Sequence, residues 1–287
     1  MNKRSFCLLA GIAVSLAILT AGCSREKCNS IQIKGSDTMV NLTQAWTEAF
    51  TKENPGINIS VTGGGSGTGI ASFISGNCDI ISASRQMTVE EIELAKKNGI
   101  EEKEYIAALD GIVVVVNPKN PVSKLTVDQL SDIFMGKIKN WKEVGGNNSS
   151  IVILSREINS GTHVFFKEHV LRKGNPKGTE EFSPNALLLP SSQAIADEVA
   201  QNSGTIGYYG MGYISPNQKL VAVSKGPKMP FIEPSIDTVK KGSYPISRPL
   251  YLYTKKDAPE MVTKFIDFAF SQEGQEIVRK TDFVPVK

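Results

Sequence analysis

The amino-acid sequence predicts an α/β protein in which short, mostly parallel strands alternate with helices and are divided between two lobes. Three observations support this prediction. Short β-rich runs such as 57–61 alternate with segments whose apolar residues recur at helical spacing, such as 39–52. The run 112–116 is continuously β-branched, which is typical of a strand buried on both faces. The same alternation begins again after this run, which indicates a second α/β unit.

The expected elements can be placed in order along the chain. In the first unit we expect strands at 31–34, 57–61, 79–83 and 112–116, and helices at 39–52, 69–75 and 89–97. In the remainder we expect strands at 151–154, 204–209, 220–223 and 249–253, and helices at 127–134, 164–170, 195–201 and 260–270. Ligands of such sheets bind beyond the carboxyl ends of the strands, so a site is expected at that edge.

The chain is expected to cross between the lobes twice, once through the run 112–116 and once near 244–253. The predicted divisions are a leader at 1–23, a tether at 24–30, a first lobe at 31–113 plus 247–287, and a second lobe at 114–246. A cleft between two lobes is where small ligands usually bind. The pattern alone leaves a single-lobed, doubly wound enzyme open as the alternative.

The first 23 residues have the features of a secretion signal. Lys3 and Arg4 form a short basic region, and residues 6–20 are almost wholly apolar but too short to span a bilayer comfortably. The segment ends in small residues before Cys23, which resembles the lipobox of bacterial lipoproteins, although Thr20 stands where that pattern usually has leucine. We therefore expect acylation of Cys23 and an extracytoplasmic protein anchored to the cell membrane by lipid. A plain secretory signal or an uncleaved anchor is the alternative.

Composition and charge exclude several classes of partner. Of the 287 residues, 40% are apolar and 21% are charged, as in ordinary globular proteins. The formal charge is +3, and removal of Lys3 and Arg4 with the leader leaves 30 basic residues against 29 acidic ones, so no nucleic-acid partner is expected.

The two histidines do not indicate a metal site. His163 and His169 make a poor ligand set, so we expect no metal and no cofactor. His163 is expected on the surface of a helix.

Two of the four cysteines remain once Cys7 leaves with the leader and Cys23 is acylated. Cys28 precedes the first expected strand, and Cys78 stands at the start of another. If these strands are parallel neighbours, their starts lie side by side, and an oxidising compartment would then allow a disulfide. Two unpaired thiols are the alternative.

One local pattern occurs three times at the junction between an expected strand and an expected helix. It comprises Ser-Asp-Thr at 36–38 and Ser-Gly-Thr at 66–68 and 160–162. The free N–H groups and the dipole of a helix N-terminus favour an anion, and the hydroxyls add directional donors. The alternative for each is an ordinary N-cap. A further Ser-Gly-Thr at 203–205 leads into a strand and is expected to be a turn.

Arginines and aspartates complete the expected site. Arg156 and Arg85 each follow a strand on the expected cleft side, and a guanidinium fork matches two oxygens of phosphate or sulfate. Arg248 is expected to be structural, at the hinge. Phosphate at neutral pH carries a proton, so its site should offer an acceptor, whereas a sulfate site should offer only donors. Asp37 and Asp110 are the candidate acceptors, with helix capping and a hinge hydrogen bond as their structural alternatives.

These motifs carry a resemblance to a known family. They stand in the order 34–39, 63–70, 82–85 and 155–162, followed by 206–210 and 244–250. From about residue 30 to its C-terminus the sequence resembles the periplasmic phosphate-binding proteins of Pst-type ABC transporters, in their compact form. The resemblance implies a type II periplasmic-binding-protein fold, in which two α/β lobes with mixed, mostly parallel sheets close on phosphate. It also implies a monomeric, non-enzymatic receptor that delivers inorganic phosphate to the permease subunits of an ABC importer.

The resemblance also implies which residues bind phosphate. They are Ser36, Thr38, the backbone of Met39 and Ser66 in the first lobe, and Arg156, Ser160, Gly161 and Thr162 in the second. Arg85 is added because it follows a strand. Some family members place an acidic proton acceptor where this chain has Arg85, which leaves the acceptor to be found between Asp37 and Asp110.

Other functions fit the motifs less well. The glycine-rich stretch 63–70 lacks the lysine of a nucleotide-binding P-loop. No nucleophile or metal set for a phosphoester hydrolase is visible in the sequence. A receptor for sulfate, molybdate or another oxyanion is the nearest alternative, and a surface adhesin or signalling lipoprotein with a similar cleft is a more distant one.

Overall fold

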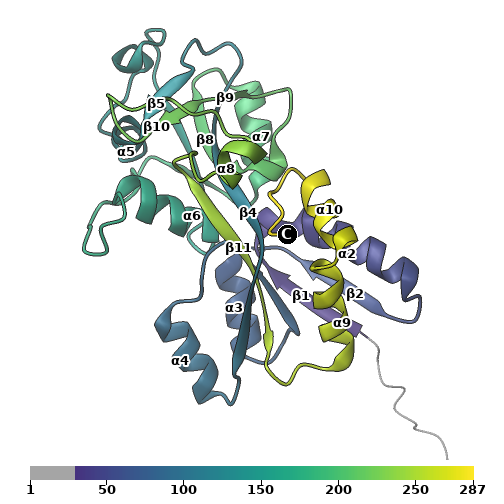
Figure 1. Cartoon of the computed structure of the whole chain (residues 1–287). Coiled ribbons are helices and arrows are strands. Elements are labelled where there is room, and N and C mark those ends of the chain that lie inside the picture. The colour runs from purple at the N-terminus through teal and green to yellow at the C-terminus, as the bar shows by residue number, and fades with distance from the viewer. Residues whose placement is uncertain (1–29) are drawn as a thin grey trace, which may run out of the picture.

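Two strands, β4 (Glu102–Val116) and β11 (Ser247–Lys255), pair antiparallel with each other and run through the middle of the molecule (Figure 1). In this computed structural model, which describes residues 30–287, both strands pass between two α/β lobes. Their register places Arg248 opposite Asp110. The two expected crossings of the chain are therefore the two central strands of one sheet.

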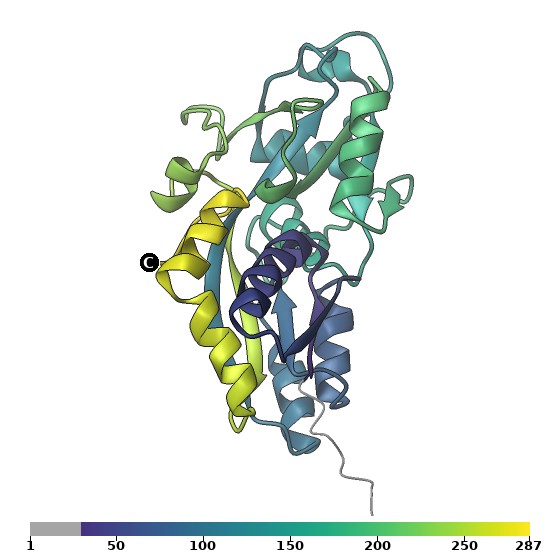
Figure 2. The same cartoon turned by 90° about the vertical axis from the view of Figure 1, so that its right-hand side faces the viewer.

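The first lobe is built on one side of β11. Its strands are β1 (Ser30–Gly35), β2 (Asn58–Thr62) and β3 (Ile80–Ala83), and its helices are η1 (Asp37–Met39), α2 (Val40–Glu53), α3 (Ser66–Ile74), α4 (Val89–Lys97), α9 (Glu260–Ala269) and α10 (Gln272–Lys280). The strand β1 lies parallel between β2 and β3, and β3 pairs antiparallel with β11. The helices α9 and α10 pack against α2 (Figure 2), where the indole of Trp46 donates to the Gly274 carbonyl.

The second lobe is built on the C-terminal half of β4. Its strands are β5 (Lys124–Thr126), β6 (Val152–Arg156), β7 (Leu187–Leu189), β8 (Thr205–Gly210), β9 (Lys219–Leu220) and β10 (Ala222–Ser224). Its helices are α5 (Val127–Phe134), η2 (Trp141–Val144), α6 (Gly161–Phe166), η3 (Lys167–Leu171), α7 (Ser192–Gln201), η4 (Met211–Tyr213) and α8 (Ile236–Lys240). The strand β8 is antiparallel to β4, whereas β6 is parallel to both β8 and β7. Among the described strands, β5 and β10 form a separate parallel pair.

The observed elements confirm the α/β fold class and most of the expected strands and helices. All five residues of the run 112–116 are fully buried, as expected. The strand β4 begins ten residues before that run, at Glu102. Its first half is polar and partly exposed, and it becomes a strand because β11 pairs with it along its whole length. The sequence prediction missed β5, β7, α8 and α10, which are short or strongly polar.

Several expectations concern the N-terminal segment. The strands β1 and β3 are parallel neighbours, as the proposed disulfide requires. The buried thiol of Cys78 lies 3.8 Å from the Gly69 carbonyl, and Cys28 and the predicted lipidation site Cys23 lie outside the described residues. The disulfide, the leader and the exact lobe boundaries therefore stay predictions. Across residues 30–287 no helix combines the length and the apolar character that a membrane span requires.

The expectation that His163 lies on a helix surface is wrong. His163 is 5% exposed, because its ring packs against Phe182 with the centroids 4.5 Å apart. Its Nδ1 lies 2.9 Å from the carbonyl oxygen of Arg156 and 3.2 Å from the hydroxyl of Ser155. The hydroxyl of Ser155 also lies 2.7 Å from that of Tyr208. The imidazole therefore joins the end of β6 to the first turn of α6.

Burial of this imidazole predicts a pH dependence of stability. It lowers the pKa of His163 from 6.5 to about 4. Between these values the unfolded chain binds a proton that the folded protein does not, so the free energy of unfolding falls as the pH is lowered from about 6.5 to 4. Urea unfolding should show that His163 contributes up to about 3 kcal/mol to this fall. The His163→Asn variant should lose that contribution, because an amide keeps a donor but does not titrate.

The exposed His169 provides the matched control. The His169→Asn variant should retain the pH dependence of the wild type. Equal pH dependence in the wild type and in His163→Asn would contradict the buried, neutral state assigned to His163.

Candidate functional site

Three helix N-termini converge between the two lobes, as the sequence predicted. Ser36 precedes η1, which continues into α2, whereas Ser66 is the first residue of α3 and Ser160 is the N-cap of α6. Ser203 and Gly204 form a turn that leads into β8, which begins at Thr205. The three Ser-x-Thr motifs at strand-to-helix junctions therefore stand at helix starts. The motif that was expected to be a turn does not start a helix.

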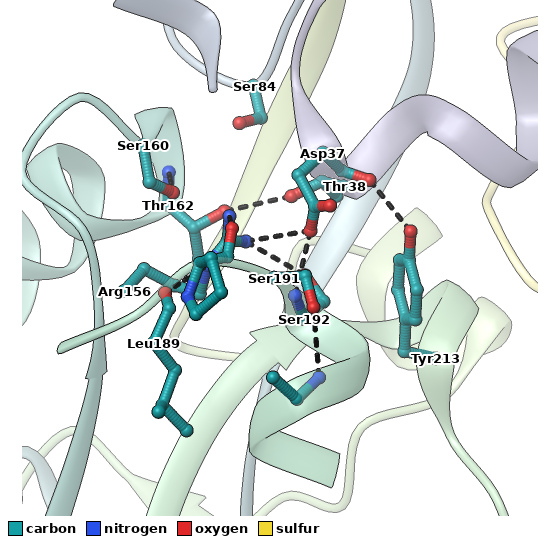
Figure 3. Close-up of polar contacts among 12 residues, drawn as sticks. Asp37, Thr38, Ser84, Arg156, Ser160, Thr162, Leu189, Ser191, Ser192 and Tyr213 are labelled. Carbon is teal, nitrogen blue, oxygen red and sulfur yellow. Dashed lines mark hydrogen bonds and ion pairs between the residues drawn. The ribbon is translucent and has the colours of Figure 1, made fainter. Parts of the chain in front are cut away.

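Five buried hydroxyl side chains, which we call the hydroxyl cluster, lie at this point. They are Thr38, Ser66, Ser84, Ser160 and Thr162. The hydroxyl oxygens of Thr38 and Thr162 are 2.9 Å apart although the two residues belong to different lobes (Figure 3). On the first lobe, the hydroxyl of Ser66 accepts a hydrogen bond from the Ser84 N–H at 3.0 Å. The cluster therefore brings together neutral donors from both lobes.

Gly161 permits this close approach of the lobes. A Cβ atom at this position would lie 2.4 Å from the hydroxyl of Ser66 and 2.6 Å from that of Ser84. Both distances are far below a normal contact, and both neighbours belong to the first lobe. A second contact between the lobes lies beside it, where Asn159 accepts from the Gly67 N–H at 3.0 Å and donates to the Gly64 carbonyl at 2.8 Å. Only glycine at 161 fits the observed closure.

Asp37 links the first lobe to the second through its carboxylate. Its Oδ2 lies 3.0 Å from Nη1 of Arg156 and accepts the Ser192 N–H at 2.8 Å (Figure 3). The latter bond places the carboxylate at the N-terminus of α7, where a negative charge is favoured. The Asp37 carbonyl also accepts the hydroxyl of Tyr213 at 2.7 Å. The contacts of Asp37 thus join η1 to three segments of the second lobe.

Arg156 is 1% exposed and is held by several acceptors. Its Nε donates to the Leu189 carbonyl at 3.3 Å and its Nη2 donates to the Pro190 carbonyl at 2.8 Å. Its Nη1 donates to the hydroxyl of Ser192 at 3.0 Å, besides its contact with Asp37. One N–H on Nη2 has no protein acceptor in the described part of the chain. The guanidinium is therefore fixed in place, and this N–H group could donate to a bound anion.

Arg248 and Asp110 form a fully buried ion pair beside the cluster. Nε and Nη2 of Arg248 donate to Oδ2 of Asp110 at 3.0 and 2.8 Å, and the Met211 N–H donates to Oδ1 at 3.0 Å. Burial raises the pKa of Asp110, and the attraction of Arg248 opposes that rise. Nη2 of Arg248 also donates to the hydroxyl of Thr162 at 2.9 Å. The expected hinge arginine therefore reaches the candidate site.

Arg85 lies apart from the cluster. Its Nη1 and Nη2 donate to the two carboxylate oxygens of Glu91 at 2.8 and 2.7 Å, and Nη1 also donates to the Gln86 carbonyl. It lines a neighbouring pocket of about 330 Å³ between the lobes. Within residues 30–287 no hydrogen bond joins Arg85 to the cluster. The strand-end residue that faces the cluster is its neighbour, Ser84.

Two further expected ligands stand on either side of Asp37 and Thr38 in the chain. Ser36 is 2% exposed, and its hydroxyl has no hydrogen-bond partner among the described residues. Met39 is fully buried, and its N–H donates to the Ser36 carbonyl at 3.1 Å. The Ser36 hydroxyl is thus a buried donor that a bound group could satisfy, whereas the Met39 N–H already has an acceptor.

Sequence reasoning missed several residues of this site. They are Ser84, Asn159, Ser192 and Tyr213. Ser84 carried a signal, because it stands at the carboxyl end of a strand next to the chosen Arg85. Asn159 carried a weaker one, as the residue before a predicted helix start. Ser192 and Tyr213 come from segments that only the tertiary structure brings near Asp37.

Comparison with known proteins places this arrangement in a family. A model described as a PBP superfamily domain matches residues 24–273. The chain is 30% identical to the phosphate-binding protein PstS of Pseudomonas aeruginosa over 270 residues, which cover 88% of this chain and 81% of that protein. It is 32% identical to the PstS of Bacillus subtilis over 261 residues, which cover 90% and 81%.

Solved structures agree with this assignment. A putative phosphate ABC transporter substrate-binding protein of Clostridium perfringens, solved with bound phosphate, superposes with a TM-score of 0.80 at 36% identity, covering 90% of this chain and 100% of that one. An ABC-type phosphate transport receptor of Vibrio cholerae gives a TM-score of 0.69 at 28% identity, with coverage of 88% and 99%. The chain therefore belongs to the PBP superfamily and, within it, to the PstS-type phosphate-binding proteins.

Proposed function

We propose that this protein is an extracytoplasmic receptor that binds inorganic phosphate between its two lobes and delivers it to an ABC importer, and that it is not an enzyme. The observation that carries the proposal is the convergence of buried hydroxyls and helix N-termini from both lobes on one point. Such donors suit a small tetrahedral oxyanion. The related receptors from Clostridium perfringens and Vibrio cholerae support phosphate as that anion.

The proposed phosphate ligands are those expected from the sequence other than Arg85, together with one further hydroxyl. They are Ser36, Thr38, the backbone of Met39, Ser66, Arg156, Ser160, Gly161 and Thr162, with Ser84 added on the geometry. The Met39 N–H would have to share its bond to the Ser36 carbonyl with the anion. Arg85 is the weakest of the expected ligands, because Glu91 holds both of its terminal nitrogens. For Arg85 to bind the anion, this ion pair would first have to open.

Asp37 is our proposed acceptor for the phosphate proton. Both carboxylate oxygens of Asp110 accept hydrogen bonds, and the residue is fully buried behind Arg248. Asp37 is partly exposed, and among the described residues its Oδ1 has no hydrogen-bond donor. A free carboxylate oxygen accepts a hydrogen bond from the P–O–H group of hydrogen phosphate and repels sulfate, which has no such group.

The proposal extends to the N-terminal segment. We propose that Cys23 is acylated and anchors the receptor to the outer face of the cell membrane, and that a monomer docks on the permease subunits. The sequence pattern of residues 1–23 supports this part. Metabolic labelling with a fatty-acid analogue tests it, since labelling should be lost in the Cys23→Ala variant.

The first test is phosphate titration of the mature chain by calorimetry. The wild type should bind phosphate, and the Ser160→Ala variant should bind it at least about tenfold more weakly, because it loses a buried donor next to an anion. The control is Ser203→Ala, because Ser203 is an exposed residue of the turn before β8 and opens the remaining Ser-Gly-Thr sequence. It should bind like the wild type. Unchanged affinity in Ser160→Ala would remove Ser160 from the ligand set, and no phosphate binding by the wild type would end the proposal.

A second test concerns closure of the lobes. The Gly161→Ala variant should bind phosphate at least about tenfold more weakly, because the added methyl group meets the hydroxyls of Ser66 and Ser84 before the lobes can close. Small-angle scattering should show that phosphate compacts the wild type but compacts this variant less. The control is Gly226→Ala, where an added Cβ has nothing within 4 Å. Normal affinity and full compaction in Gly161→Ala would contradict the closure seen here.

A third test concerns selectivity. The ratio of the sulfate Kd to the phosphate Kd should fall by about tenfold in Asp37→Asn, because an amide does not repel sulfate and accepts a proton weakly. The ratio isolates the effect of the carboxylate on selectivity, since any loosening of Arg156 would weaken the binding of both anions together. A ratio equal to that of the wild type would assign the acceptor role to another group.

A further inference from the structure

Arg248 contacts the hydroxyl cluster from a strand that belongs to neither lobe alone. It lies on β11 and is 2% exposed. Its Nη2 donates to the hydroxyl of Thr162 at 2.9 Å, and a longer contact of 3.4 Å reaches that of Thr38. Its Nη1 donates to the Ser84 carbonyl at 2.9 Å. One guanidinium therefore holds three members of the cluster, two from the first lobe and one from the second.

A contribution to protein stability does not by itself explain why the Arg248 guanidinium is buried. Arg248 faces Asp110 directly across the β4–β11 ladder and pairs with it at 2.8 Å. Taking two charges out of water is costly, and apolar residues of similar volume often stabilise a protein as well as a buried ion pair does. Asp110 neutralises the guanidinium without using the N–H groups that face Thr162 and Ser84. The pair thus supplies oriented donors at the cluster with no net charge.

The chemistry of a hydroxyl shows what these donors do. A hydroxyl has one proton and two lone pairs, and arginine only donates. When an N–H group on Nη2 of Arg248 donates to a lone pair of Thr162 Oγ1, the proton of that hydroxyl must point in another direction. Thr38 Oγ1 lies 2.9 Å away on the other lobe, at the point where the helix N-termini converge. The hydroxyl of Thr162 is therefore biased to act as a donor toward that point.

We propose that Arg248 is a positioning residue that orients the hydroxyl of Thr162, and more weakly that of Thr38, to donate to the bound anion, while Asp110 cancels its charge. This inference rests on the proposed function and adds to it a residue that acts through the ligands. The contact also depends on closure, since Thr162 reaches Arg248 only when the second lobe lies against β11. Orientation of the donor and closure of the cleft are therefore coupled through one guanidinium.

A double-mutant cycle of Arg248→Lys and Thr162→Val, followed by phosphate calorimetry, tests the inference. Lysine keeps a charge for Asp110 but lacks the planar fork. In the wild-type background Arg248→Lys should weaken phosphate binding by about tenfold. In the Thr162→Val background the same change should weaken it less than about twofold, because there is no hydroxyl left to orient. A purely structural role would give the same loss in both backgrounds.

Two further variants keep the test decisive. Arg279→Lys is the control, since Arg279 is an exposed arginine paired with Glu276 on α10, and it should leave the phosphate Kd unchanged in both backgrounds. If Arg248→Lys fails to fold by circular dichroism, the charge-neutral pair Arg248→Met with Asp110→Asn replaces it in the cycle.

The outcomes separate this inference from the proposed function. A wild type that binds phosphate, with equal losses in the two backgrounds, would mean that Arg248 acts on the anion directly or on the fold, and would overturn the inference alone. Failure of the wild type to bind phosphate would overturn the proposed function and this inference with it. A loss of phosphate affinity in the wild-type background only would support both the inference and the proposed function.

Discussion

The arrangement of the site depends on a contact between the lobes that only very small groups permit. Gly161 lies so close to the hydroxyls of Ser66 and Ser84 that a methyl group would not fit. Beside it the hydroxyls of Thr38 and Thr162 touch across the cleft. Because side chains in such a contact exclude water, each hydrogen bond is made in a low dielectric, where it is stronger and where an unpaired polar group is costly. In the proposed receptor, closure of the lobes and recognition of the anion would therefore be one event.

The positive charges near the cluster are each matched by a carboxylate. Arg156 is paired with Asp37, and Arg248 with Asp110. In the proposed site, a small anion between these pairs would therefore meet little net charge and would be held mainly by hydroxyls, N–H groups and helix dipoles. Neutral donors recognise the shape and protonation of an anion, whereas unpaired cations would attract any anion. The near-neutral sequence, with 32 basic and 29 acidic residues, is consistent with this reliance on local donors.

Local sequence signals were enough to predict the fold class and the three helix starts. A Ser-x-Thr after a β-rich run marks a helix N-terminus whatever lies around it, so 36–38, 66–68 and 160–162 were found. Where the prediction failed, the missing information was tertiary. Ser84 and Arg85 both follow the last residue of β3, and the sequence does not say which of these two neighbours faces the cluster, so the contact of Ser84 with Ser66 was missed. Nothing local to α6 predicts that Phe182 covers His163.

The long central strands explain why the hinge and the site are difficult to separate. Asp110 and Arg248 are directly opposite each other in the β4–β11 register, and the register shifts only beyond them, between Leu250 and Tyr251. A slip by one residue would turn the Arg248 side chain to the opposite face of the sheet, away from Thr162 and Ser84. The pairing of β11 with residues 102–111 of β4 therefore fixes both the path between the lobes and the direction of the guanidinium. A change in strand register at this crossing would alter the binding site even if every ligand were unchanged.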